Sequence, residues 1–264
     1  MPQTNEISVY HFRFTREDLE CVPKEEVAFL LQIGGLIHEV ISLQKYIYMS
    51  SQGVDNPIER MAENAQGMYF YRLLAGSLFE GWELLTKRHR EYKRIIAKYK
   101  SKLDSIAKLA FDKLQKYFSD KNNACQRIRN KFSHHHDYGE IIKILSKWPS
   151  DDKLDIYLSE THANCRYMAS DIVTSLAMLG TTEIKDMQPK LYNLIEEISE
   201  VARAFIEVVS EYLSLIFQEV AEKKNLKGKE IKITDVPSLH ELRLRYFVAN
   251  PENTKSKENP AKPT

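Results

Sequence analysis

The pattern of hydrophobic and polar residues along this chain follows the period of the α-helix over most of its length. The longest such stretch runs from about residue 187 to 224, where apolar residues such as Leu194, Ile198 and Val201 recur every three or four positions. Residues with this spacing lie on one face of a helix. Further apolar residues, among them Ala202 and Val209, widen the stripe, so the pattern favours a helix in a bundle core over a narrow coiled-coil seam.

Shorter stretches with the same period predict further helices. Pro23 and Asn56-Pro57 are typical helix starts, because proline is tolerated in the first turn and asparagine caps it. Gly228 is expected to end the longest helix. The other helices are expected over about 23–48, from 57 through 85 with an extension into 87–94, from 103, at or just before the segment 127–138, and over 165–179.

Alternation of apolar and polar residues, which is the period of a β-strand, is limited to short segments. These candidate strands are 7–14, 154–160, 229–236 and 243–248. The sequence therefore predicts a mainly α fold, a helical bundle of long antiparallel helices with a few short peripheral strands. We expect one mainly helical domain over residues 1–249, and the composition of residues 250–264 predicts a disordered tail.

Composition narrows the class of protein. The chain has 264 residues, of which 43% are hydrophobic and 28% are charged, as in a soluble protein with a sizeable core. It holds no uncharged apolar run of about 18 residues and begins without the pattern of a secretory signal, so a cytoplasmic protein is expected, with no membrane segment. Cys21, Cys125 and Cys165 show no CxxC spacing, which argues against a disulfide framework and a structural zinc site.

Positive charge is concentrated in one region although the net charge is only +1. The segment Lys87–Lys102 holds eight lysines and arginines, one histidine and a single acid, Glu91. Such a run indicates either a solvated helix end or a surface that binds phosphates. If it binds RNA, the candidate contacts are Arg90, Lys93 and Arg94, and Arg127 and Lys131 would extend the same positive field.

The segment 127–138, RIRNKFSHHHDY, is the strongest candidate for chemistry. It combines three imidazoles with three cationic side chains. A metal-dependent phosphohydrolase would use His136-Asp137 with a distant histidine such as His38 and a later acid such as Asp171. Consecutive histidines on a helix point about 100° apart and cannot converge on one ion, and neighbouring cations disfavour a metal. We therefore expect no metal and no cofactor, because the arginines suit a phosphate better.

Within this segment, the Arg129-Asn130 pair followed by His134 resembles the Arg-x4-6-His signature of the HEPN superfamily, the helical-bundle domains named for higher eukaryotes and prokaryotes nucleotide-binding. The resemblance in architecture covers about 24–148, with 160–228 as a C-terminal helical extension. It implies a metal-independent endoribonuclease of a toxin-antitoxin, abortive-infection or antiviral defence system. The alternative that it implies is a non-catalytic HEPN-like module for dimerisation or RNA binding.

The resemblance implies a division of roles among these residues. His134 would transfer protons, Arg129 would stabilise the scissile phosphate, and Asn130 would support them by hydrogen bonding. On a continuous α-helix, residues five apart lie about 140° apart, so Arg129 and a histidine at 134 would not share a face. Either the helix changes near Ser133, or a second chain completes the site, and His135 and His136 remain alternatives.

The resemblance also suggests partners and supporting groups. RNA is the expected substrate, a homodimer is the expected active unit, and an antitoxin or another defence-system protein is an additional partner to consider. An acid from the second helix often supports the site in such proteins, which makes Glu80 and Glu83 candidates, although a surface carboxylate without a role is the more common interpretation of each. Two roles are open for Ile128, Phe132 and the aromatic run 68–71. They could cover an isologous dimer interface, or they could belong to the core.

Overall fold

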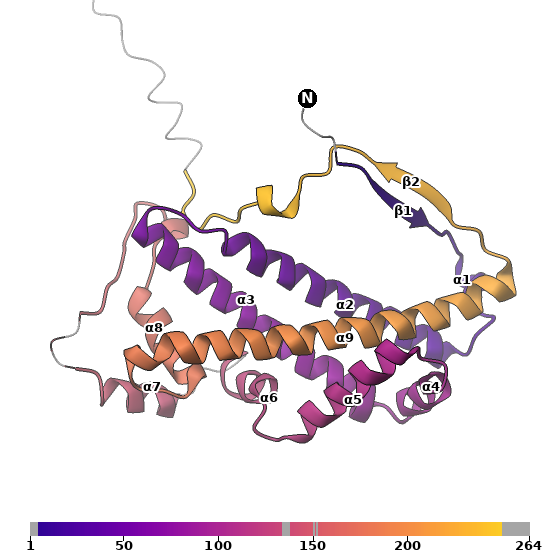
Figure 1. Cartoon of the computed structure of the whole chain (residues 1–264), viewed down its shortest axis with the longest axis horizontal. Coiled ribbons are helices and arrows are strands. Elements are labelled where there is room, and N and C mark those ends of the chain that lie inside the picture. Colours follow the sequence, from indigo (N-terminus) through magenta and orange to yellow (C-terminus); the bar gives the residue numbers. More distant parts are fainter. Residues whose placement is uncertain (1–4, 134–137, 150, 152, 250–264) are drawn as a thin grey trace, which may run out of the picture.

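A computed structural model of the chain describes residues 5–133, 138–149, 151 and 153–249, and it confirms the predicted mainly α fold. Figure 1 shows the arrangement of the elements. The α-helices are α1 (Arg16–Leu19), α2 (Lys24–Ser50), α3 (Pro57–Glu83), α4 (Arg90–Lys100), α5 (Ser105–Ser119), α6 (Ala124–Ile128), α7 (Tyr138–Leu145), α8 (Met168–Leu179) and α9 (Met187–Lys224). The others are π-helical turns η1 (Leu84–Arg88) and η2 (Arg129–Ser133), 3-10 turns η3 (His162–Asn164), η4 (Ile184–Asp186) and η5 (Leu239–Glu241), and strands β1 (Ile7–His11) and β2 (Lys229–Ile233).

The long helices α2, α3 and α9 form the centre of the bundle, and α5 packs across α9 (Figure 1). One hydrophobic core runs through all of them, with Phe29 of α2, Leu78 of α3 and Phe205 of α9 fully buried. The region 24–148 and the C-terminal helices therefore share a core. Among the described helices, α2 has the length and composition of a membrane span, but one of its faces lies in this core.

The ends of the helices follow local capping chemistry. Asn56 accepts hydrogen bonds from the backbone N–H groups of Ile58 and Glu59 at the start of α3, as predicted for an N-cap before proline. The expectation that Gly228 ends the longest helix is wrong, because α9 ends at Lys224 and its C-cap, Asn225, adopts the left-handed conformation with φ 50°. Gly228 has another role, since a Cβ atom there would lie 2.5 Å from the ring of Phe12.

The predicted helix from residue 57 does not continue unbroken into the basic segment. After α3 the chain makes the π-helical turn η1, and His89 is extended with φ −127° and ψ 130° before α4 begins. The break gives α4 its own direction, so its apolar residues Tyr92, Ile95 and Tyr99 are buried.

Two of the four predicted strands do not form. In the segment 154–160, only Tyr157 makes an isolated bridge, with Arg166. The segment 243–248 has no strand partner, and side chains hold it instead: Arg245 pairs with Glu59, and the Tyr246 hydroxyl donates to the Cys165 carbonyl at 2.6 Å. Alternation alone cannot supply the hydrogen-bonding partner that a strand needs.

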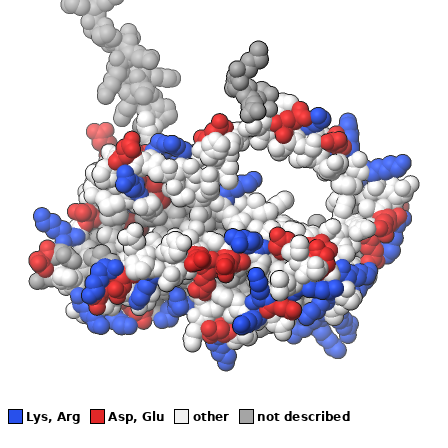
Figure 2. All heavy atoms as spheres, in the orientation of Figure 1, with Lys and Arg blue, Asp and Glu red and all other residues white. Residues whose placement is uncertain are grey.

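Strands β1 and β2 pair with each other in antiparallel register, with Ile7 opposite Ile233 and Val9 opposite Ile231. All ten residues of this ribbon are exposed. Figure 2 shows an opening between the ribbon and the helices beneath it. The ribbon is therefore joined to the bundle at its ends and does not cover it.

Candidate functional site

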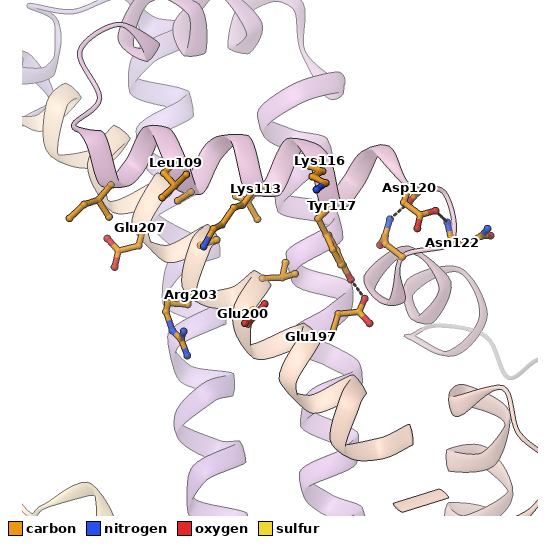
Figure 3. Close-up of a pocket in the computed structure, with 16 residues that line it drawn as sticks. Leu109, Lys113, Lys116, Tyr117, Asp120, Asn122, Glu197, Glu200, Arg203 and Glu207 are labelled. Carbon is orange, nitrogen blue, oxygen red and sulfur yellow. Dashed lines mark hydrogen bonds between the residues drawn. The ribbon is translucent and has the colours of Figure 1, made fainter. Parts of the chain in front are cut away.

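Helix α6, which leads into the candidate site, is fixed at its N-terminus by side chains from three directions. The Glu197 carboxylate of α9 accepts hydrogen bonds from the Ala124 N–H at 3.1 Å and from the Tyr117 hydroxyl at 2.6 Å (Figure 3). The Tyr117 oxygen in turn accepts from the Cys125 N–H, and Asn123 caps the Gln126 N–H. The first-turn N–H groups, which a helix cannot satisfy itself, are thus bound to α9, α5 and the cap residue.

These contacts lie at one end of a groove between α5 and α9 (Figure 3). The groove has a volume of about 890 Å³ and is lined by both signs of charge, with Lys113 and Lys116 on α5 and Glu200, Arg203 and Glu207 on α9. Burial raises the pKa of the Tyr117 hydroxyl, so this group stays protonated and keeps donating to Glu197. The contacts that hold α6 thus lie at one end of the groove, and its mixed charge does not favour a polyanion.

A π-helical turn, η2, follows α6 directly and carries the arginine of the sequence motif. Hydrogen bonds between residues five apart wind such a turn more loosely than an α-helix, and π turns occur often at functional sites. Ile128 and Phe132 are buried in the core on the inner side of this segment. Of the two roles left open for them, dimer interface or core, the burial of both supports the core, whereas Tyr69 of the aromatic run is exposed.

Arg129 lies against the C-terminal part of α3. Its Nε donates to Glu80 Oε1 at 2.7 Å, and its Nη1 donates to the Asn130 side-chain oxygen at 3.3 Å. The guanidinium carbon lies 5.8 Å from the centroid of the Phe79 ring. No described residue accepts a hydrogen bond from Nη2, and the Arg129 side chain is 39% exposed to solvent. The structure therefore orients the guanidinium while one edge of it stays accessible.

The other cations of the motif do not converge with Arg129. Arg127 is half-buried, and its Nη1 donates to the Asn122 carbonyl at 3.5 Å. Lys131 pairs with Glu140 of α7 at 3.7 Å. Among the described residues of the motif, only Arg129 and the exposed Asn130 share one cluster. The three candidate histidines, His134, His135 and His136, lie outside the described residues.

The basic segment forms an exposed face on α4. Arg90, Lys93 and Arg94 are exposed, and Figure 2 shows Lys and Arg side chains gathered over this end of the molecule. The face adjoins the candidate site through α3, because η1 joins α3 to α4 and η2 packs against α3. A cationic surface of this kind can hold a phosphate backbone without reading sequence.

Lys98 belongs to the same helix but has a structural role. Its ammonium contacts Glu26 at 2.9 Å and Glu219 at 3.2 Å, and the Tyr99 hydroxyl joins the same cluster. Burial alone would lower the pKa of Lys98, but hydrogen bonds to Glu26, Tyr99 and Glu219 outweigh burial and raise it. Lys98 therefore ties α4 to α2 and α9.

The described residues do not support the alternative of a metal centre built from His38, His136, Asp137 and Asp171. Within the part of the chain that the structure describes, no three His, Cys, Asp or Glu side chains lie close enough to hold an ion. His38 is exposed on α2, and Asp171 pairs with Arg166 at 2.7 Å. The remaining two candidates, His136 and Asp137, lie outside that part.

Three features of the site have no signature in the sequence. They are the π-helical winding of η2, the Phe79 ring beside Arg129, and the pairing of Lys131 with α7. The Phe79 contact joins residues 50 positions apart, and the other two features depend on how the backbone turns after α6. Periodicity in the sequence cannot reveal such contacts.

Comparison with models of protein families gives no match for this chain, and comparison with curated proteins and with solved structures gives none.

Proposed function

We propose that this protein is a metal-independent endoribonuclease in which Arg129 binds the scissile phosphate and His134 transfers protons. The observation that carries the proposal is the arrangement of Arg129. Glu80 fixes its Nε at 2.7 Å while Nη2 has no partner among the described residues. A guanidinium held in this way is ready to donate to a phosphate oxygen without reorganising.

The winding of η2 also bears on the histidine. Residues five apart are hydrogen-bonded in a π turn and so lie nearly above one another, unlike residues five apart in an α-helix. In a segment with this winding, an arginine and a histidine five positions apart share one face, and five positions is the spacing of Arg129 and His134 in the sequence. The placement of His134 is part of the proposal, since that residue lies outside the described ones, and His135 and His136 are the alternatives.

The reaction balances without a metal or a cofactor. One imidazole takes the proton of the ribose 2′-hydroxyl, and the 2′-oxygen forms a bond to phosphorus. The bond from phosphorus to the 5′-oxygen breaks, and an imidazolium gives that oxygen a proton. The products are a 2′,3′-cyclic phosphate and a free 5′-hydroxyl, and Arg129 stabilises the charge on the phosphorane between them.

Two proton-transfer roles favour two copies of the chain. A single histidine is poorly placed to act as base and acid in one step, whereas a two-fold dimer brings two histidines and two arginines into one cleft. The exposed cations Arg90, Lys93 and Arg94 would hold the flanking RNA. The setting proposed is a cytoplasmic toxin or defence protein, regulated by an antitoxin or another protein of that system.

Labelled single-stranded RNA incubated with the purified chain in EDTA tests the proposal. We expect fragments that end in a 2′,3′-cyclic phosphate, and a loss of at least about a hundredfold in rate for Arg129→Ala and His134→Ala. His135→Ala and His136→Ala show which imidazole acts. The matched control is a substrate with 2′-deoxyribose, which must stay intact. RNA binding without cleavage would support the alternative, a non-catalytic RNA-binding or dimerisation module.

A further inference from the structure

A second polar cavity lies between α3 and α8, at a distance from η2 along the bundle. It encloses about 360 Å³, a volume typical of small-ligand sites. Its walls come from three segments that are far apart in sequence: the 65–72 part of α3, the 170–178 part of α8 with Arg166 before it, and Tyr246 after β2. Neither the candidate nuclease residues nor the face of α4 contributes to it.

The charge of the cavity is positive. Two guanidiniums, Arg72 and Arg166, and one carboxylate, Asp171, are the charged groups among its described lining residues. The side chain of Arg166 is only 12% exposed; its Nη2 pairs with Asp171, and its Nε is buried without a hydrogen-bond partner among the described residues. A buried N–H of a charged group without a partner is costly. An anion in the cavity would offset the positive charge of this guanidinium, which lines the cavity beside Arg72.

The same arginine is held in place by its surroundings. Its guanidinium carbon lies 4.6 Å from the centroid of the Tyr246 ring, and the Tyr246 hydroxyl is fixed by the Cys165 carbonyl at 2.6 Å. Arg72 lies 5.1 Å from the centroid of the Tyr69 ring in a similar arrangement. Both guanidiniums are thus oriented before a ligand arrives, as in sites that bind phosphate or carboxylate.

The rest of the lining suits an organic body more than a bare ion. The Gln66 side chain lines the cavity, and its oxygen is buried without a partner among the described residues. Met68 and Met178 supply polarisable apolar walls that suit a flat ring. Ser170 and Thr174 add hydroxyls on one side of α8.

We propose that this cavity binds a small phosphate monoester with a flat apolar body, the chemistry of a nucleoside monophosphate. Arg166 and Arg72 hold the phosphate, Gln66 accepts from a donor on the body, and the two methionines contact its ring. The site lies on the opposite part of α3 from Glu80, so it is a binding site separate from RNA cleavage.

Isothermal titration with AMP tests the proposal, with adenosine and inorganic phosphate as the two partial ligands. The titration uses the full chain carrying His134→Ala, without RNA, so the outcome does not depend on nuclease activity. We expect AMP to bind at least about tenfold more tightly than either partial ligand, since each supplies only half of the contacts. Arg166→Gln and Gln66→Leu should each weaken AMP binding by about tenfold or more.

Arg245→Gln is the matched control, because Arg245 precedes Tyr246 in the same segment, pairs with Glu59 and does not line the cavity. Its affinity for AMP should stay within about twofold of the parent chain. Thr174→Trp, which fills the cavity without removing an ion pair, should abolish binding in a protein with an unchanged circular dichroism spectrum. Absence of AMP binding at about 1 mM, phosphate binding as tight as AMP, or AMP binding that Thr174→Trp leaves intact would each overturn the proposal.

Discussion

Glu80 Oε1 and Arg129 Nε lie 2.7 Å apart, although 49 positions separate the two residues in the chain. The pair joins the last part of α3 to the π-helical turn η2, and both side chains are partly exposed, at 26% and 39%. An ion pair with this exposure contributes about 1 kcal/mol or less to stability. Its value therefore lies in fixing the direction of the guanidinium.

Glu80→Gln should lower RNA cleavage by about tenfold while the free energy of unfolding changes by less than about 1 kcal/mol. The neutral amide holds Arg129 less firmly. Orienting the guanidinium then adds to the activation free energy of cleavage. Cleavage rates and urea denaturation measure the two quantities. The control is Glu59→Gln, which removes an ion pair to Arg245 with the same 2.7 Å distance and similar exposure at the other end of α3. An equal loss of activity in both variants would contradict a positioning role for Glu80.

The exposed face of α4 should contribute phosphate contacts that do not depend on sequence. Replacing Arg90, Lys93 and Arg94 together with Gln is expected to weaken RNA binding most at low salt. The slope of log K against log salt should become shallower by up to about 2, since fewer counterions are released. Fluorescence anisotropy over a series of salt concentrations measures the slope.

A variant with the same change in net charge provides the control for this experiment. Lys45, Lys153 and Lys190 are exposed outside α4, and replacing all three with Gln removes three charges elsewhere on the surface. If both triple variants flatten the salt dependence equally, the effect is one of overall charge, and α4 is only a solvated helix face.

The proposed composite site predicts complementation between two inactive chains. Arg129→Ala protein and His134→Ala protein should each be inactive, and mixing them should restore part of the activity when subunits exchange. Each mixed dimer then holds one intact arginine and one intact histidine in the shared cleft. Light scattering after size exclusion establishes the dimer, and labelled subunits establish exchange. A monomer at the concentration where RNA is cut would rule the shared site out.

The Glu219 carboxylate should make stability depend on acidic pH. Hydrogen bonds from Lys223, Tyr99 and Lys98 hold the pKa of Glu219 at about 2, below its ordinary value of 4.5. A depressed folded-state pKa adds stability that is present above pH 4.5 and is lost as the pH falls from 4.5 towards 2. Partial exposure of the group screens this contribution to about 1 kcal/mol.

Glu219→Gln should therefore lower the free energy of unfolding near pH 7 and make it less dependent on pH between about 4.5 and 2. Urea denaturation at several pH values measures this. Glu207→Gln, which removes an exposed carboxylate from the same helix, is the control and should keep the pH dependence of the parent chain. The same pH dependence in Glu219→Gln as in the parent chain would show that other groups carry it.

The sequence predicted the long helices well because their signal is local. The three-and-four spacing over 187–224 matches the bounds of α9, Met187–Lys224, since a buried stripe on one helix needs only its own residues to be recognised. The break at His89 had no such signal. It arises where η1 leaves α3 and α4 buries Tyr92 and Tyr99, which is a matter of tertiary packing.

The candidate site likewise combines residues with a local sequence signal and contacts that depend on tertiary packing. Arg129 stands out in the sequence because of its neighbours, and the resemblance directed attention to an acid on α3. The selection of Glu80 as its partner depends on how η2 sits against that helix. The cavity with Arg72 and Arg166 had no signature at all, because its walls meet only after α3, α8 and the segment of Tyr246 have packed together.

The pairing of β1 with β2 makes the polypeptide a closed ring, since contacts such as Glu6 to Lys232 join residues 226 positions apart. Closing a flexible loop of that length costs about 5 kcal/mol of chain entropy. The exposed ribbon buries little apolar surface, so its burial offsets only a small part of this cost. The helices must therefore assemble first and hold the two ends near each other. We therefore expect the ribbon to form last during folding and to open first. The exchange rate of its backbone amides with deuterium would report whether the bundle beneath it is complete.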